Sequence, residues 1–120
     1  MNSTEERHPM TTEELQAALR LDPAYRTALE IEGTTYLTGM VSDVSCTDPV
    51  EAVIETGEQR RFADQLADEI QRMADPGAAV QLYHDETGHG RGAWYDITGV
   101  QVDRLNHLLV VVAGDCNATG

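Results

Sequence analysis

One amphipathic segment separates two groups of short strand-like segments, and this order restricts the fold more than any other feature of the chain. Residues 58–74 carry apolar side chains at the spacing of a helix that buries one face. These side chains are Phe62, Ala63, Leu66, Ala67, Ile70 and Met73. Three segments with strand patterns precede this helix and three follow it, namely residues 28–32, 35–44 and 50–55, and then 79–84, 93–102 and 107–113.

A second, shorter helix is expected near the N-terminus. Thr11 followed by Glu14 forms a capping-box signature for a helix start. An apolar stripe continues through Leu19, and Pro23 should end the helix near Asp22, because the residue before a proline disfavours helical geometry.

Glycines mark the expected irregularities of the strands. Gly33 permits a tight turn after residues 28–32, and Gly39 suits a bend or bulge in the strand that follows. Within residues 93–102 the apolar side chains change parity, and a bulge at Gly99 would reconcile the two halves.

These patterns predict a single α+β domain over residues 11–113. We expect a mostly antiparallel bent sheet or a small, partly open barrel of about six strands, with one long amphipathic helix against it and a short N-terminal helix. A chain of 120 residues can close such a core without metal or disulfide bonds. Residues 1–10 are predicted to form a disordered leader and residues 114–120 a flexible tail.

The charge balance is strongly acidic. Twenty-one aspartates and glutamates face eight basic residues, giving a net charge of −13, and every basic residue is an arginine. An acidic surface without lysine is typical of cytosolic proteins from extreme halophiles, where molar salt screens the self-repulsion of the carboxylates. A GC-rich genome would explain the missing lysines but not the surplus of acid, so the sequence favours a halophilic protein.

This charge limits the expected partners and location. Nucleic acid is disfavoured because phosphate binding needs a basic face, and anionic membranes are disfavoured for the same reason. No apolar run is long enough to cross a bilayer, and the polar start MNSTEERHPM lacks the order of a signal peptide, so a cytoplasmic location is expected. Cys46 and Cys116 are then expected to be free thiols.

The segment HDETGHGRG, residues 84–92, suggests chemistry most directly. Its imidazoles and carboxylates could ligate a metal, and the candidate ligands are His84, Asp85, Glu86 and His89. The two histidines stand five residues apart among three glycines, which departs from the helical zinc motif and favours a solvated hairpin loop between two strands. Because His84 shares parity with Val80 and Leu82, its side chain is expected to point inward.

Aromatic residues form a second candidate site. A face for stacking on bases or rings could use Tyr36, Tyr83, Arg91, Trp94 and Tyr95, although core packing is the commoner use of such side chains. The arginines at positions 60, 61 and 72 are interleaved with acids and predict a solvated helix face. No phosphate-binding glycine loop, nucleophile elbow or CxxC motif occurs, so no cofactor is expected.

The stretch LEIEGTTYLTGMVSDVSCTDPVEAVIE, residues 29–55, together with the helix before it, resembles the opening of the Sm-like RNA-binding barrels. Those proteins also run from a helix through a strand and a glycine turn to a bent strand with a central glycine. The resemblance covers less than a third of the chain, and the helix over residues 58–74 departs from the Sm order. No function is inferred from it.

The absence of a coherent catalytic set predicts a small acidic cytoplasmic binding or regulatory domain of halophilic type, without catalysis. Such a domain would act through a protein partner or self-association, for which the exposed edges of a small open sheet would serve. Two other classes stay open. One is a metal- or ligand-binding enzyme domain centred on residues 84–92, and the other is a small barrel that binds single-stranded nucleic acid through Trp94 and Tyr95.

Overall fold

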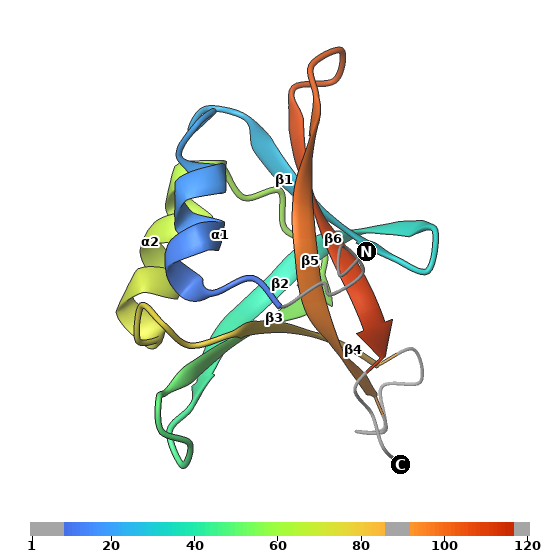
Figure 1. Ribbon diagram of the computed structural model, residues 1–120. Coiled ribbons are helices and arrows are strands. Elements are labelled where there is room, and N and C mark those ends of the chain that lie inside the picture. Colours follow the sequence, from blue (N-terminus) through green and yellow to red (C-terminus); the bar gives the residue numbers. More distant parts are fainter. Residues whose placement is uncertain (1–8, 86–91, 117–120) are drawn as a thin grey trace, which may run out of the picture.

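The computed structural model describes residues 9–85 and 92–116, which form a closed six-stranded barrel with two α-helices on one side (Figure 1). The strands are β1 (Arg26–Ile31), β2 (Thr34–Val44), β3 (Glu51–Gly57), β4 (Val80–His84), β5 (Ala93–Asp103) and β6 (Leu108–Cys116). The helices are α1 (Thr12–Leu19), before β1, and α2 (Ala63–Met73), between β3 and β4. The predicted α+β fold with a small, mostly antiparallel barrel and two helices is confirmed.

The barrel mixes antiparallel and parallel neighbours. β3 and β4 run parallel because α2 carries the chain back between them. β1 and β6 also run parallel, residues 26–30 lying alongside residues 108–112, and this pairing closes the barrel. The sequence predicted exposed sheet edges that could serve a partner. No such edge is found among the described strands, because β1 and β6 pair with each other.

The core fills the barrel and continues under the helices. Alternate residues of each strand point inward, as the period of two requires. The largest fully buried strand side chains are Leu29, Ile54, Leu82, Ile97 and Leu109. Leu15 and Leu19 of α1 and Leu66 and Ile70 of α2 belong to the same core cluster. Burying one such side chain contributes about 1.5–3 kcal/mol, so the helices are held to the barrel by their apolar faces.

The N-terminal helix begins as the sequence predicts. The Thr11 side chain accepts a hydrogen bond from Glu14 N at 3.2 Å, and Glu14 Oε1 accepts one from Thr11 N at 3.0 Å. The helix ends at Leu19, a few residues before the expected end near Asp22.

The second helix begins later than expected, at Ala63 rather than at residue 58. Residues 58–62, called here the β3–α2 linker, are extended at this point because they pair with two strands. Gln59 bridges to Thr38 of β2, and Phe62 bridges to Arg26 of β1. The linker thereby pairs with both strands beyond the direct β1–β2 pairing of residues 29–31 with residues 34–36.

Two glycines allow β2 and β3 to approach closely. The register of the pair shifts between Thr38 and Val41, so the predicted irregularity at Gly39 is confirmed. A Cβ at Gly57 would lie 2.5 Å from Gly39 Cα, a distance that side chains do not tolerate. The predicted irregularity near Gly99 is confirmed as well, since the β5–β6 register shifts between Ile97 and Gly99.

The ends of the described chain are tied to the barrel. Met10 N donates a hydrogen bond to Ile97 O at 2.8 Å. β6 continues to Cys116, whereas the apolar pattern predicted that this strand ends at residue 113. The leader prediction for residues 1–8 and the tail prediction for residues 117–120 lie outside the described residues.

The carboxylates lie at the surface. Within residues 9–85 and 92–114, no aspartate or glutamate is buried, and the buried polar residues are three threonines. Over the described part of the chain, no helix has the length and apolar character needed to cross a membrane.

Candidate binding groove

The side chain of His84 points into the barrel, as its parity predicts. It lies at the end of β4, where His84 Nδ1 and Thr56 Oγ1 share a hydrogen bond of 2.8 Å. Its ring packs on Tyr36, with 4.3 Å between ring centroids. These contacts give His84 a structural place in the barrel wall.

The other candidate residues of the segment 84–92 do not form a metal site with His84 among the described residues. Asp85 is half-buried, whereas Glu86, His89 and Arg91 lie outside the described residues. Among the residues that the structure describes, no three His, Cys, Asp or Glu side chains are grouped so that they could hold a metal ion. The segment connects β4 to its antiparallel neighbour β5, which is the position of a hairpin connection.

The aromatic candidates divide between the two faces of the barrel wall. Tyr83 and Trp94 form a pair across β4 and β5, with ring centroids 4.8 Å apart, and Trp94 is exposed. Tyr95 is buried, and its hydroxyl lies 3.5 Å from Glu32 Oε2, to which it donates. Tyr36 packs on His84. Trp94 and Tyr95 are therefore not brought together as one stacking face, because successive residues of a strand point to opposite sides.

The structure also locates Cys46, Arg60 and Arg61, for which the sequence made predictions. Cys46 has a free, exposed thiol in the turn after β2. Arg60 and Arg61 do not belong to the solvated helix face that was expected, because they precede α2 in the β3–α2 linker.

Two buried threonines fix the β3–α2 linker. Thr27 donates from both its N–H and its Oγ1 to Arg61 O, at 2.9 and 3.0 Å. Thr38 makes the same double contact with Gln59 O, at 3.2 and 3.0 Å, and Gln59 N donates back to Thr38 O. Both threonines are fully buried, so these bonds are shielded from water.

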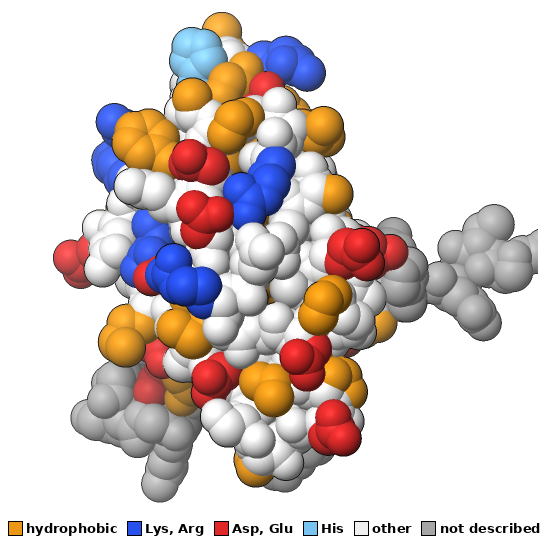
Figure 2. All heavy atoms as spheres, turned by 90° about the vertical axis from the view of Figure 1, so that its left-hand side faces the viewer, with side chains coloured by type: hydrophobic (Ala, Val, Ile, Leu, Met, Phe, Trp, Pro, Cys, Tyr) orange, Lys and Arg blue, Asp and Glu red, His pale blue; other side chains and the backbone are white. Residues whose placement is uncertain are grey.

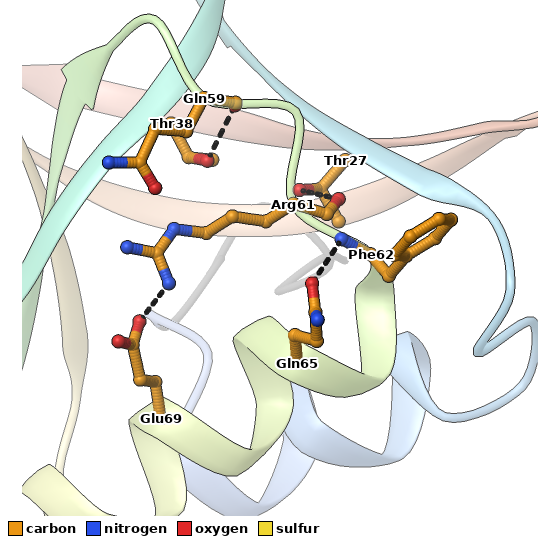
Figure 3. A network of polar contacts seen from close by, with 7 residues as sticks. All are labelled: Thr27, Thr38, Gln59, Arg61, Phe62, Gln65 and Glu69. Carbon is orange, nitrogen blue, oxygen red and sulfur yellow. Dashed lines mark hydrogen bonds and ion pairs between the residues drawn. The ribbon is translucent and has the colours of Figure 1, made fainter.

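The extended linker sends alternate side chains to opposite sides, as Figure 3 shows for Arg61 and Phe62. Arg61 reaches along α2 and forms an ion pair with Glu69. Arg60 and Phe62 line a different hollow from Gln59 and Arg61. Pairing with β1 and β2 thus determines which linker side chains face which hollow.

The start of α2 is attached to the segment before β1. Phe62 N donates to Gln65 Oε1 at 3.2 Å, Ala63 N to Tyr25 O at 2.8 Å, and Asp64 N to Pro23 O at 3.2 Å. These backbone donors are satisfied within the protein. The segment 23–25 and the helix start are consequently held together.

A hollow of about 650 Å³ lies where these segments meet the β5–β6 loop. We call it the basic groove, and its lining residues are Ala24, Tyr25, Arg26, Arg60, Phe62, Asn106, His107 and Leu108. The Arg26 guanidinium carbon lies 5.3 Å from the centre of the Phe62 ring, which is cation–π distance. The rings of Tyr25 and His107 pack edge to face with centroids 5.2 Å apart.

The basic groove differs in charge from the rest of the protein. None of its lining residues is a carboxylate, although acids outnumber bases in the chain by 21 to 8. Arg20 pairs with Asp68 at 2.9 Å and Arg61 pairs with Glu69, but among the described residues Arg26 and Arg60 form no ion pair. In Figure 2, the upper part of the helix-bearing face shows arginine, hydrophobic and histidine side chains, with carboxylates among them.

A second hollow of about 420 Å³ adjoins the basic groove. We call it the apolar hollow, and its lining residues are Pro23, Ala24, Phe62, Asp64 and Gln65. Ala24 and Phe62 line both hollows, and the Phe62 ring is partly exposed, at 38%. Phe62 therefore stands between a cationic space and an apolar space.

The loop that completes the groove is held by Asp103. Its carboxylate accepts hydrogen bonds from Asn106 N at 3.1 Å and from Asn106 Nδ2 at 2.9 Å. The Asn106 side chain first, and then the Asn106 N–H, lower the pKa of Asp103. His107 follows with φ 57°, and this turn directs it toward Tyr25.

Comparison of the chain with protein-family models, with curated proteins and with solved structures gives no match. The helix, strand, glycine turn and bent strand that resemble the Sm-like opening are present as α1, β1, Gly33 and β2. No family model supports a relationship. The fold and the groove define the class as a small closed mixed barrel with a surface groove of basic and aromatic residues.

Proposed function

We propose that the protein is a binding domain without catalytic activity that docks a protein partner in the basic groove. One observation carries this proposal: among the described residues Arg26 and Arg60 have no ion-pair partner, and they line a groove without a described carboxylate, beside the partly exposed ring of Phe62, on an otherwise acidic protein. Arginine and aromatic side chains are enriched at the centres of protein interfaces, where they contribute most of the binding energy.

The chemistry of the groove supports binding rather than a reaction. Its polar groups are two guanidinium groups, one amide, one phenol and one imidazole. The imidazole of His107 packs against Tyr25, and no described serine, threonine or cysteine lines the groove as a nucleophile for it. Guanidinium groups with aromatic rings instead suit the recognition of an anionic, partly apolar surface.

The setting of this interaction is proposed from composition. A net charge of −13 with no lysine is the pattern of proteins that fold in molar salt inside a cell. We therefore propose that the domain acts in the cytoplasm of a halophile. At molar salt the Debye length is about 3 Å. Only short-range contacts, such as those within a groove, then keep a favourable electrostatic contribution to binding.

The test is an affinity pull-down in molar KCl with matched variants. Phe62→Ala and Arg60→Ala alter the groove. Trp94→Ala is the matched aromatic control, since Trp94 is 37% exposed against 38% for Phe62 but lies on β5 away from the groove residues. Arg72→Ala, on α2, is the arginine control.

A protein that the wild type and both controls recover in stoichiometric amount, and that both groove variants lose, would support the proposal. Equal recovery by the groove variants would place the partner on another surface and contradict it. Turnover of a small molecule by the purified domain that Arg60→Ala abolishes would also contradict it, because the groove would then be an active site.

A further inference from the structure

We propose that the occupant of the groove is a short acidic segment of the partner, with an aspartate or glutamate in the basic groove and a neighbouring aliphatic side chain in the apolar hollow. This inference rests on the proposed function and adds the chemistry of the ligand to it. It follows from the two hollows that share Phe62.

The basic groove provides for the carboxylate. The guanidinium groups of Arg26 and Arg60 both line it and have no ion-pair partner among the described residues. A guanidinium group presents a planar fork of N–H donors that matches a carboxylate. The stacking of Arg26 on Phe62 restricts the Arg26 side chain before binding, so less entropy is lost when it engages the ligand.

The apolar hollow provides for a second side chain. Pro23, Ala24 and Phe62 line it, and its acid, Asp64, disfavours a second carboxylate there. Backbone hydrogen bonds from Ala63 N to Tyr25 O and from Asp64 N to Pro23 O hold its two walls together. A hollow with fixed walls binds an aliphatic side chain without first having to form.

Charge around the two hollows favours a peptide over a nucleic acid. Asp64 lies at the apolar hollow and has no ion-pair partner among the described residues. A polyanion leaving the basic groove in this direction would meet this carboxylate, whereas a peptide carries its charge on single side chains. The volumes of about 650 and 420 Å³ also suit a few residues of peptide.

The test measures binding of short fluorescein-labelled peptides by anisotropy, at moderate and at molar KCl. Each peptide carries one glutamate and one leucine in a glycine–serine background, either adjacent or separated by one or two residues. Matched peptides replace the glutamate by glutamine or the leucine by serine. Labelled oligo(dT) and oligo(rU) are the nucleic-acid arms, and the protein is the full chain as wild type, Arg60→Ala, Phe62→Ala and Arg72→Ala.

We expect one spacing to bind best and the glutamine peptide to bind about tenfold more weakly, as for the loss of one charge-assisted hydrogen bond. Arg60→Ala should weaken binding of the glutamate peptide by a similar factor and leave binding of the glutamine peptide unchanged, because the Arg60 guanidinium and the peptide carboxylate interact with each other. Phe62→Ala should remove the preference for leucine over serine, and Arg72→Ala should change nothing.

Equal binding of the glutamate and glutamine peptides, or no binding of any peptide, would overturn this inference. Groove-dependent binding of an oligonucleotide that exceeds peptide binding would overturn it in favour of nucleic acid. A dimer in size-exclusion chromatography with light scattering that Arg60→Ala dissociates would identify a second copy as the occupant instead. If the partner pull-down depends on the groove while the peptides fail, only the ligand chemistry is wrong; if neither depends on the groove, the proposed function is wrong as well.

Discussion

Thr27 donates twice to the carbonyl oxygen of Arg61, from its N–H at 2.9 Å and from its Oγ1 at 3.0 Å. Thr27 and Arg61 lie far apart in the sequence, so this contact joins β1 to the β3–α2 linker (Figure 3). Thr38 holds Gln59 in the same way. Arg60 lies between these two fixed points, and the shape of the basic groove therefore depends on threonines that are buried in the barrel wall.

Thr27→Val should lower the free energy of unfolding by about 1 kcal/mol, the net contribution of a typical hydrogen bond. The effect should stay near this value because Arg61 O still accepts from the residue 27 N–H and the side-chain shape is kept. Urea unfolding in molar KCl followed by circular dichroism measures it. Thr35→Val is the control, since Thr35 is exposed on β2 and should change stability by less than about 0.5 kcal/mol. Equal losses in the two variants would contradict the role given to Thr27.

Phe62→Ala should separate binding from stability. The Phe62 side chain makes no capping hydrogen bond, and the bond from its N–H to Gln65 Oε1 remains after substitution. The free energy of unfolding should therefore change by no more than about 1 kcal/mol, whereas partner recovery should fall at least tenfold, as for an aromatic residue at the centre of an interface. A variant that loses both in proportion would show that Phe62 acts through folding.

Local patterns predicted the elements that local physics determines. The Thr11–Glu14 capping box marked the start of α1, and the glycine at position 39 marked the irregularity of β2, because each needs only residues close in sequence. The parity of His84 with its strand neighbours predicted its inward orientation for the same reason.

Contacts between distant segments escaped prediction. Apolar periodicity extended the second helix back to residue 58, but pairing of Gln59 with Thr38 and of Phe62 with Arg26 keeps the linker extended. Closure by β1 and β6 joins the two ends of the strand order, and no local pattern encodes it. The groove combines Arg26, Arg60 and His107 from three such segments, so the sequence presented them only as scattered charges.

His84→Ala should destabilise the protein without releasing a metal. The substitution removes the hydrogen bond to Thr56 and the packing on Tyr36, which together contribute about 1–3 kcal/mol. Purified wild-type protein should contain no stoichiometric zinc by plasma emission analysis, and chelator should leave its melting temperature unchanged.

His107→Asn is the matched control for that experiment. Asparagine tolerates the positive φ of 57° found at this position, so the loss of stability should be limited to the edge contact of the His107 ring with Tyr25, about 0.5–1 kcal/mol. Stoichiometric metal in the wild type that is lost in His84→Ala would instead establish a metal site in the segment 84–92.

Gly57→Ala should destabilise the protein strongly for the addition of a single methyl group. The new Cβ would lie 2.5 Å from Gly39 Cα and 2.9 Å from Gly39 N, and backbone atoms of a paired strand move only with the sheet. A loss of about 1–3 kcal/mol is expected from such overpacking. Gly99→Ala, also in a strand but with no neighbouring atom within 4 Å, should cost less than half as much. Similar losses at both glycines would mean that strand propensity, not the close approach, determines the cost.

Stability should rise with KCl over the range in which the surface charges become screened. The net charge is −13, and no carboxylate within residues 9–85 and 92–114 is buried. The repulsion therefore acts at the surface and weakens as the Debye length falls from about 10 Å at 0.1 M to about 3 Å at 1 M. A gain of about 1–2 kcal/mol would raise the melting temperature by roughly 5–10 °C in a domain of this size. The double variant Asp48→Asn and Glu58→Gln removes two exposed negative charges, from −13 to −11, and should reach the same melting temperature at lower KCl. A melting temperature that is already maximal in dilute buffer, in both proteins, would contradict adaptation to molar salt and leave the missing lysines to genome composition.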